Sequence, residues 1–162
     1  GTVRDVAFFD AIVENVAAQY CVDMDRIFVA GHSLGAWMAN TVACLRGDVV
    51  RGSATVGGDS AITDCAGPAA ALLSHNPKDN LSPFKSTERA GGMRTPENAC
   101  APEPDPAEPS ALSCARHRGC DGGNDVVWCP HEIDTDHRGE YYPHVWPRGF
   151  GEEVAKFFRS LP

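Results

Sequence analysis

The feature that most constrains the fold of this chain is a serine between two glycines, where an apolar run meets a helical pattern. Residues 31–36 read GHSLGA and follow directly on the apolar run 27–30. Beyond Ser33, apolar residues recur at the three- and four-residue spacing of an amphipathic helix, which we expect to end near Gly47. Strand, sharp turn and helix in this order are typical of an elbow that exposes a nucleophilic serine. A bare Gly-x-Ser-x-Gly is common by chance, so the prediction depends on this context.

Helical and strand patterns alternate along the rest of the chain. The spacing of apolar residues predicts helices over 5–20, about 84–94 and 150–161, and strands over 49–56, 69–74, 111–117 and 125–129. The proline-rich, acidic segment 101–110 is expected to be an exposed loop. This alternation predicts an α/β fold with a mostly parallel sheet flanked by helices, and sites at the carboxyl ends of its strands.

Composition and charge restrict the classes of partner. The formal net charge of −8 argues against nucleic acid and against an anionic membrane surface, because both require clustered Lys and Arg. No apolar run approaches the ~20 residues of a membrane-spanning helix. Seven cysteines favour an oxidising compartment, so we expect a secreted protein with disulfides. The odd count leaves one thiol free, or paired with a segment outside this sequence.

A serine hydroxyl becomes a good nucleophile only when a base removes its proton and a carboxylate orients that base. Asp79, in HNPKDNLSP, follows the strand expected over 69–74, and His144, in YYPHVWP, lies between the last expected strand and the last helix. The order Ser, Asp, His is that of the α/β-hydrolases. We therefore predict Ser33 as nucleophile, His144 as base and Asp79 as the orienting acid. The backbone N–H of Leu34 is the expected oxyanion donor, and the reaction requires neither cofactor nor metal.

Other residues compete for these roles. Asp59 and Asp64 are alternative acids, although loop aspartates are usually solvated turn or cap residues. His131 and His137 lie in a charged loop and are expected to be exposed. We therefore favour Asp79 and His144.

Two further residues are candidates for substrate binding. His32 flanks the nucleophile and either lines the acyl pocket or packs in the fold. Trp146 lies beside His144, and a structural role is favoured over a substrate platform. Trp37 and Met38 fall on the expected core face of the helix after the elbow.

A binding module is the alternative from another class. Cys114, Cys120, Cys129 and His131 form a cysteine–histidine cluster whose members are separated by five, eight and one residues. Structural zinc sites favour paired ligands two to four residues apart. The spacing therefore favours the hydrolase.

Three segments carry a resemblance to a known family. YCVDMDRIFVAGHSLGAWMANTVAC, HNPKDNLSP and HVWP resemble the carbohydrate-esterase family of feruloyl and acetylxylan esterases, whose scaffold polyhydroxybutyrate depolymerases share. The family's motif positions are matched by Val22, Asp23, Arg26 and Ile27 before the elbow, by His75, Asp79 and Pro83 in the acid loop, and by His144, Trp146 and Pro147. Asn76 stands where the family has glycine. Cys120 and Cys129 are also similar to a cysteine pair of this group.

The resemblance implies a secreted serine esterase that acts on ester-bearing plant polysaccharide, of the feruloyl or acetyl xylan type. A polyester depolymerase on the same scaffold is the alternative. Family members have further strands before the elbow, and a loop among them completes the oxyanion hole. Residues 1–162 are therefore expected to be the C-terminal part of a single α/β-hydrolase domain, with the missing N-terminal part as their partner.

One disulfide is predicted from heights along the sheet. From Cys21 the strand rises ~3.3 Å per residue over about six residues. The following helix returns ~1.5 Å per residue over about eleven residues to Cys44. The two cysteines should therefore reach the same edge of the sheet, and we expect them to be bonded. Two more bridges are expected among Cys65, Cys100, Cys114, Cys120 and Cys129, with their connectivity open.

Overall fold

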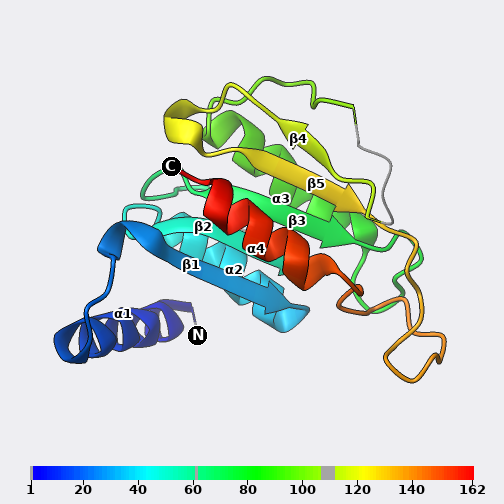
Figure 1. Ribbon diagram of the computed structural model, residues 1–162, viewed down its shortest axis with the longest axis horizontal. Coiled ribbons are helices and arrows are strands. Elements are labelled where there is room, and N and C mark those ends of the chain that lie inside the picture. Colours follow the sequence, from blue (N-terminus) through cyan, green and yellow to red (C-terminus); the bar gives the residue numbers. More distant parts are fainter. Residues whose placement is uncertain (1, 61, 107–111) are drawn as a thin grey trace.

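The computed structural model describes residues 2–60, 62–106 and 112–162, which form a five-stranded sheet covered by helices (Figure 1). The strands are β1 (Ile27–His32), β2 (Val50–Val56), β3 (Ala70–His75), β4 (Ala115–His117) and β5 (Val126–Pro130). The α-helices are α1 (Thr2–Gln19), α2 (Leu34–Leu45), α3 (Phe84–Glu97) and α4 (Phe150–Ser160), and the short 3₁₀ helices are η1 (Met24–Arg26) and η2 (Asp121–Gly123).

The sheet has the strand order β1-β2-β3-β5-β4, and every pair is parallel except the antiparallel pair of β4 with β5. Helix α4 lies on one face of the sheet, and α2 and α3 lie on the other (Figure 1). The predicted fold class is thus confirmed. The strand expected over 111–117 is shorter than predicted, because β4 spans Ala115–His117. Residue 111, the first of the expected strand, belongs to the segment 107–111, which lies outside the described residues.

The core lies on both faces of the central strands. All six residues of β3 are buried. Under α4, Phe150 and Phe157 pack with Leu72 and Val127. On the opposite face, a second cluster joins α1 and α2 to the sheet, and a third packs α3 against β3 and β5. β3 is therefore the most enclosed strand, and the loop that follows it begins from a rigid base.

The disulfides correct the predicted pairing. The bonds are Cys44–Cys65, Cys100–Cys120 and Cys114–Cys129, and Cys21 is a free, exposed cysteine. The predicted Cys21–Cys44 bond is therefore wrong. Equal height along the sheet does not make two cysteines neighbours. Cys44 is fully buried, and its carbonyl accepts a hydrogen bond from the backbone N–H of Ala66 (2.8 Å), which brings the 62–69 segment to its side. The zinc alternative is wrong as well, because its three cysteines are all in disulfides: Cys114 is bonded to Cys129, and Cys120 to Cys100.

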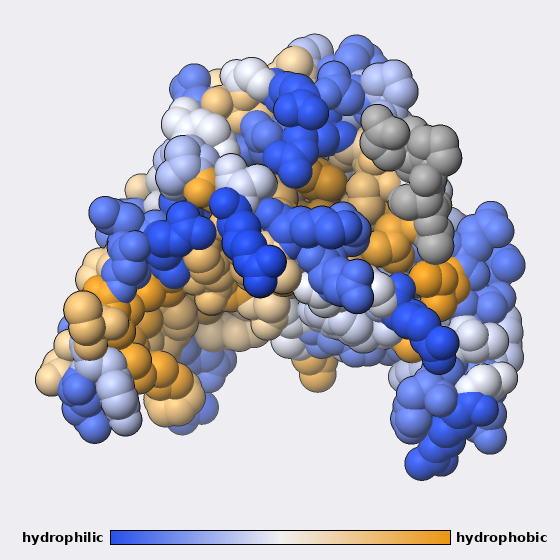
Figure 2. Space-filling view, in the orientation of Figure 1, coloured by the Kyte–Doolittle hydropathy of each residue, from blue (hydrophilic) through white to orange (hydrophobic). Residues whose placement is uncertain are grey.

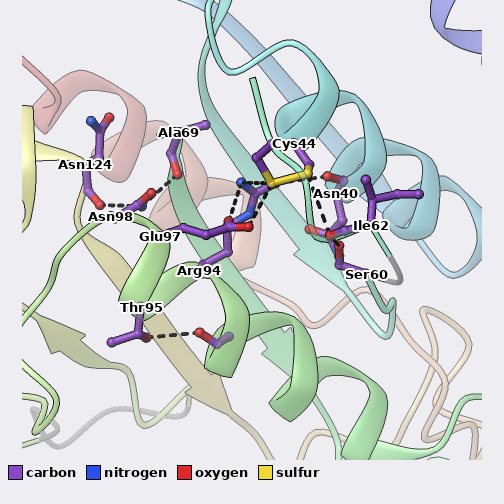
Figure 3. A network of polar contacts seen from close by, with 12 residues as sticks. Asn40, Cys44, Ser60, Ile62, Ala69, Arg94, Thr95, Glu97, Asn98 and Asn124 are labelled. Atoms are coloured by element: carbon purple, nitrogen blue, oxygen red, sulfur yellow. Dashed lines mark hydrogen bonds and ion pairs between the residues drawn. A yellow bond between two sulfur atoms is a disulfide. The ribbon is translucent and has the colours of Figure 1, made fainter. Parts of the chain in front are cut away.

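A buried polar network connects α2 and α3 (Figure 3). The guanidinium of Arg94, on α3, is buried, and its Nη2 donates to the carbonyl oxygen of Asn40, on α2 (3.0 Å). Its Nη1 pairs with Glu97 (3.2 Å), whose other carboxylate oxygen lies 2.8 Å from Cys65 Sγ. Asn98 donates to the carbonyls of Ala69 and Asn124. Arg94 therefore joins α3 to the helix that follows the elbow, and Asn98 joins the end of α3 to the segments that enter β3 and β5.

Helix α1 is attached more loosely than the others. It joins the core through Val6, and its Asp10 pairs with Arg46, the residue that follows α2 (2.6 Å). Phe8 is 68% exposed and Ile12 46% exposed. Figure 2 shows hydrophobic side chains gathered over α1 and the neighbouring part of the sheet edge. No described helix is long and apolar enough to span a membrane.

Candidate active site

The predicted nucleophile lies on a strained turn. Ser33 separates β1 from α2 and has φ 57° and ψ −122°, values that a residue with a side chain rarely adopts. Its backbone N–H donates to the carbonyl of Val56, at the end of β2 (2.9 Å). A Cβ on Gly31 would lie 2.1 Å from the carbonyl oxygen of Gly35, so the strand can enter the turn only through glycine. The elbow expected from the sequence is therefore present at the carboxyl end of β1.

The predicted acid is enclosed and saturated with hydrogen-bond donors. The side chain of Asp79, in the loop after β3, is 1% exposed. Its Oδ1 accepts from the backbone N–H groups of Leu81 (2.8 Å) and Ser82 (3.0 Å). Its Oδ2 accepts from His144 Nδ1 (2.6 Å) and lies 2.9 Å from His75 Nε2.

Burial acts against this carboxylate and the donors act for it. Burial, the largest single influence, raises the pKa of Asp79, whereas the N–H groups of Ser82, His144, Leu81 and His75 together lower that pKa below its ordinary value. Asp79 is therefore an anion at neutral pH, as the orienting acid of a catalytic histidine must be.

The predicted base faces the acid with one ring nitrogen. His144 is 5% exposed and lies in the loop between β5 and α4. Because its Nδ1 faces Asp79, the Nε2 nitrogen is left to face a substrate or nucleophile. A Cβ on Gly57 would lie 3.3 Å from His144 Cε1, and Ser33 is hydrogen-bonded to the preceding residue, Val56. Ser33 and His144 therefore both lie beside the end of β2, Ser33 next to Val56 and His144 next to Gly57.

An asparagine stabilises the acid loop where the similar family has glycine. The Asn76 side chain is buried; its Nδ2 donates to the carbonyl of Ile133 (2.8 Å), and its Oδ1 accepts from the N–H of Lys78 (2.8 Å). The side chain therefore ties the loop of Asp79 to the segment that leads from β5 to His144. A glycine at this position could form neither of these side-chain hydrogen bonds.

The other three predicted site residues lie around this centre. The ring of His32 lies 4.7 Å from that of His144, and burial, followed by the charge of His144, lowers the pKa of His32. Leu34 is the first residue of α2, where backbone N–H groups lack partners within the helix, and its side chain is 82% exposed. Trp146 packs edge-on against the buried ring of Phe150 (5.1 Å), which fits its favoured structural role.

The rival residues lie elsewhere, but two were misjudged. Asp59 is fully buried, not solvated, and it pairs with Arg89. His131 is 2% exposed, because it follows β5 and its backbone N–H donates to the carbonyl of His75 at the end of the neighbouring strand β3 (3.1 Å). Burial lowers the pKa of His131 to about 4. His137 and Asp64 are exposed, as expected of loop residues.

Two further residues differ from the expectation or were not predicted at all. Trp37 is expected on the core face of α2, but it is 38% exposed, whereas Met38 does pack against the core. His75 received no role, yet it contacts the same carboxylate oxygen as His144. Its position at the end of a strand, four residues before Asp79, is the sequence signal from which this contact could have been predicted.

Sheet order, elbow and histidine–carboxylate pair together define an α/β-hydrolase-type chain. The solved structure of an acetyl xylan esterase from Aspergillus awamori superposes with a TM-score of 0.68 at 12% identity, over 95% of this chain and 66% of that one. A thermostable esterase superposes with a TM-score of 0.67 at 13% identity, over 94% of this chain and 35% of that one. At these identities the likeness shows the fold alone.

Two curated proteins are similar in sequence. Feruloyl esterase D of Neurospora crassa is 31% identical over 137 residues, which are 81% of this chain and 47% of that protein. Feruloyl esterase C of Emericella nidulans is 32% identical over 160 residues, 94% of this chain and 54% of that protein. The chain spans about half the length of these relatives, and no family model matches it. The chain belongs to the α/β-hydrolase esterase family.

Proposed function

We propose that this chain carries the catalytic triad of a serine esterase, with Ser33 as nucleophile, His144 as base and Asp79 as acid. The observation that carries the proposal is the buried His144–Asp79 contact of 2.6 Å beside the strained elbow of Ser33. A structural histidine–carboxylate pair has no need of a serine at positive φ next to it. The combination fits acyl transfer.

The reaction proceeds in two steps on these residues. His144 takes the hydroxyl proton of Ser33 through Nε2 as Ser33 attacks the ester carbonyl, and it then gives a proton to the leaving alcohol. Asp79 orients the imidazole through Nδ1 and stabilises its transient positive charge. The backbone N–H of Leu34 stabilises the oxyanion. A water activated by His144 then hydrolyses the acyl-enzyme, and no cofactor takes part.

The substrate is an ester borne by plant polysaccharide, of the feruloyl or acetyl xylan type. The names of the relatives in sequence, feruloyl esterases C and D, support this class. Three disulfides favour an oxidising compartment, so we propose that the protein is secreted. His32, beside His144, is the residue we place on the acyl side of the pocket.

We further infer that residues 1–162 form the C-terminal part of one esterase domain. Strand β1 lies at the open edge of the sheet, and an apolar groove of about 300 Å³ runs between it, α1 and α2. Phe8, Ile12, Val29 and Met38 line this groove. Exposed apolar surface next to a free strand edge is suited to further strands and helices of the same domain.

The decisive experiment replaces the nucleophile in the intact protein. Ser33→Ala should abolish hydrolysis of methyl ferulate and acetylated xylan, with a loss of turnover of about 10⁴–10⁶, because the variant lacks the nucleophilic oxygen. The fold should stay intact, because only one oxygen is removed from a turn. A fluorophosphonate probe should label the wild type and leave the variant unlabelled. Circular dichroism controls for folding. Retention of more than a few per cent of the activity would refute the assignment.

A further inference from the structure

We propose that His75 is a positioning residue for the esterase site: a second histidine that, together with His144, holds the catalytic carboxylate of Asp79. This inference rests on the proposed function of Ser33, His144 and Asp79. His75 Nε2 lies 2.9 Å from Asp79 Oδ2, the oxygen that accepts from His144 at 2.6 Å. The side chains of His75 and Asp79 are each 1% exposed, so no solvent competes for the contact.

His75 is one of four hydrogen-bond donors to the carboxylate of Asp79. Asp79 receives two backbone N–H groups on Oδ1 and two ring nitrogens on Oδ2. An anionic carboxylate has no hydrogen to give, so both ring nitrogens that face it must carry protons. His75 therefore donates from Nε2. Its donation stabilises negative charge on the oxygen with which His144 also interacts.

The other ring nitrogen of His75, Nδ1, faces Thr87, which in turn contacts the residue beside the helix that follows Ser33. Thr87 Oγ1, on α3, lies 2.8 Å from His75 Nδ1 and 2.6 Å from the carbonyl oxygen of Gly58. A Cβ on Gly58 would lie 2.3 Å from the Cβ of Ala36, in the first turn of α2. Residue 58 is therefore in close contact with the helix that begins after Ser33. The hydroxyl of Thr87 has one hydrogen, which the two acceptors His75 Nδ1 and the Gly58 carbonyl share, and it links His75 to residue 58 beside the nucleophile's helix.

The surroundings determine the charge of His75. The ionisable groups that interact with it are Asp79, His144, His32 and His131, while α3 presents the uncharged ring of Phe84 at 5.5 Å. Burial is the main cause that lowers the pKa of His75, and Asp79 acts against it. The ring is therefore neutral at pH 7, with its one proton directed at Asp79. The carboxylate keeps its full negative charge for His144.

The test compares two replacements of His75 in the intact protein. His75→Leu fills the space without a donor, whereas His75→Gln places an amide N–H where Nε2 was. We expect His75→Leu to lower kcat by about tenfold to a hundredfold, the usual worth of one hydrogen bond to a charged group. Without that donor the carboxylate attracts the proton of His144 more strongly, so the acidic limb of the pH profile should move up by about half a unit or more. His75→Gln should keep the wild-type limb and most of the activity.

Thr87 provides a second test that leaves the histidine in place. Thr87→Val should lower kcat severalfold, because the ring loses its anchor, and Thr87→Ser should restore it. Thr95→Val is the matched control, since the Thr95 hydroxyl bonds within α3, to the carbonyl of Gly91 (3.0 Å, Figure 3). It should leave kcat unchanged. All rates are divided by the fraction of protein that a fluorophosphonate probe labels.

The outcomes separate this inference from the proposed function. Equal activity losses for His75→Leu and His75→Gln, with the acidic limb unmoved, would mean that His75 only fills space and would overturn the inference alone. If His75→Leu does not fold, an unchanged kcat in Thr87→Val would overturn it. Wild-type protein without Ser33-dependent ester hydrolysis would overturn the proposed function, and the inference with it.

Discussion

The two sides of the candidate site differ in how completely this chain builds them. On the acid side, Asp79 is 1% exposed and satisfied by four donors, and His144 is 5% exposed. On the nucleophile side, the side chain of Leu34 is 82% exposed and that of Trp37 is 38% exposed. Both sides lie at the carboxyl ends of parallel strands, β1 for the nucleophile and β3 for the acid, with β2 between them. The same sheet thus presents one closed half-site and one open half-site.

The difference follows from the position of the strands in the sheet. The acid follows β3, which has β2 and β5 as neighbours and is buried along its whole length. The nucleophile follows β1, an edge strand whose residues are half-buried or exposed. A central strand brings loops from both neighbours to its end, whereas an edge strand brings them from one. The acid–base half is therefore self-sufficient, and the oxyanion half is where we expect another segment to contribute.

The largest expected loss of kcat comes from a substitution of the acid in the closed half of the site. Asp79→Asn in the intact protein should lower kcat by about 10⁴, because an amide no longer selects the reactive tautomer of His144. Asp59→Asn is the comparison: Asp59 is equally buried, but it pairs with Arg89. Its loss should reduce thermal stability and leave the activity of the folded fraction intact. Comparable kcat losses in the two variants would remove the distinction between catalytic and structural aspartates.

The open half predicts a loss when residues 1–162 are expressed alone. One missing oxyanion donor costs about 10²–10³ in rate, and the uncovered edge of β1 favours aggregation. We expect this fragment to be poorly soluble or nearly inactive, and an added N-terminal segment of the same domain to restore activity. Hydrolysis rates with and without that segment measure the effect. A soluble monomeric fragment with full activity would show that residues 1–162 already contain the second donor.

The sequence predicted the elements of the sheet well and lateral contacts poorly. Periodicity places Ser33 and Asp79 at strand ends and His144 between the last strand and the last helix, because the side chains of helices and strands repeat with fixed periods. The pairing of Cys44 depended on the 62–69 segment, which has no periodic pattern. The burial of His131 depended on a backbone contact with His75, at the end of a strand and 56 residues earlier (131 − 75 = 56). Such contacts between distant segments leave no local signal.

The closed half also predicts how stability changes with pH. Burial lowers the pKa of His131 from 6.5 to about 4, so between these values the unfolded chain binds a proton that the folded chain does not. The free energy of unfolding should therefore decrease as pH falls from 6.5 to about 4, by about 3 kcal/mol from this residue. His131→Phe should flatten urea-denaturation free energies over that window. His137→Gln, at an exposed histidine, should leave the slope unchanged; a slope unaffected by His131→Phe would contradict the assignment.

The smallest expected effect tests whether the apolar face of α1 is exposed to solvent in the intact protein or covered by another part of the domain. Phe8 and Tyr141 have similar exposures in residues 1–162, at 68% and 65%. If a further part of the domain covers α1, Phe8→Ser in the intact protein should cost about 2 kcal/mol, the value for removing a buried aromatic side chain from its contacts. Tyr141→Ser, on the acid side, should stay within about 0.5 kcal/mol of the wild type, as surface substitutions do. Both are measured as the free energy of unfolding in urea. Equal, small changes would mean that α1 faces solvent in the intact protein and that the open half of the site is completed elsewhere.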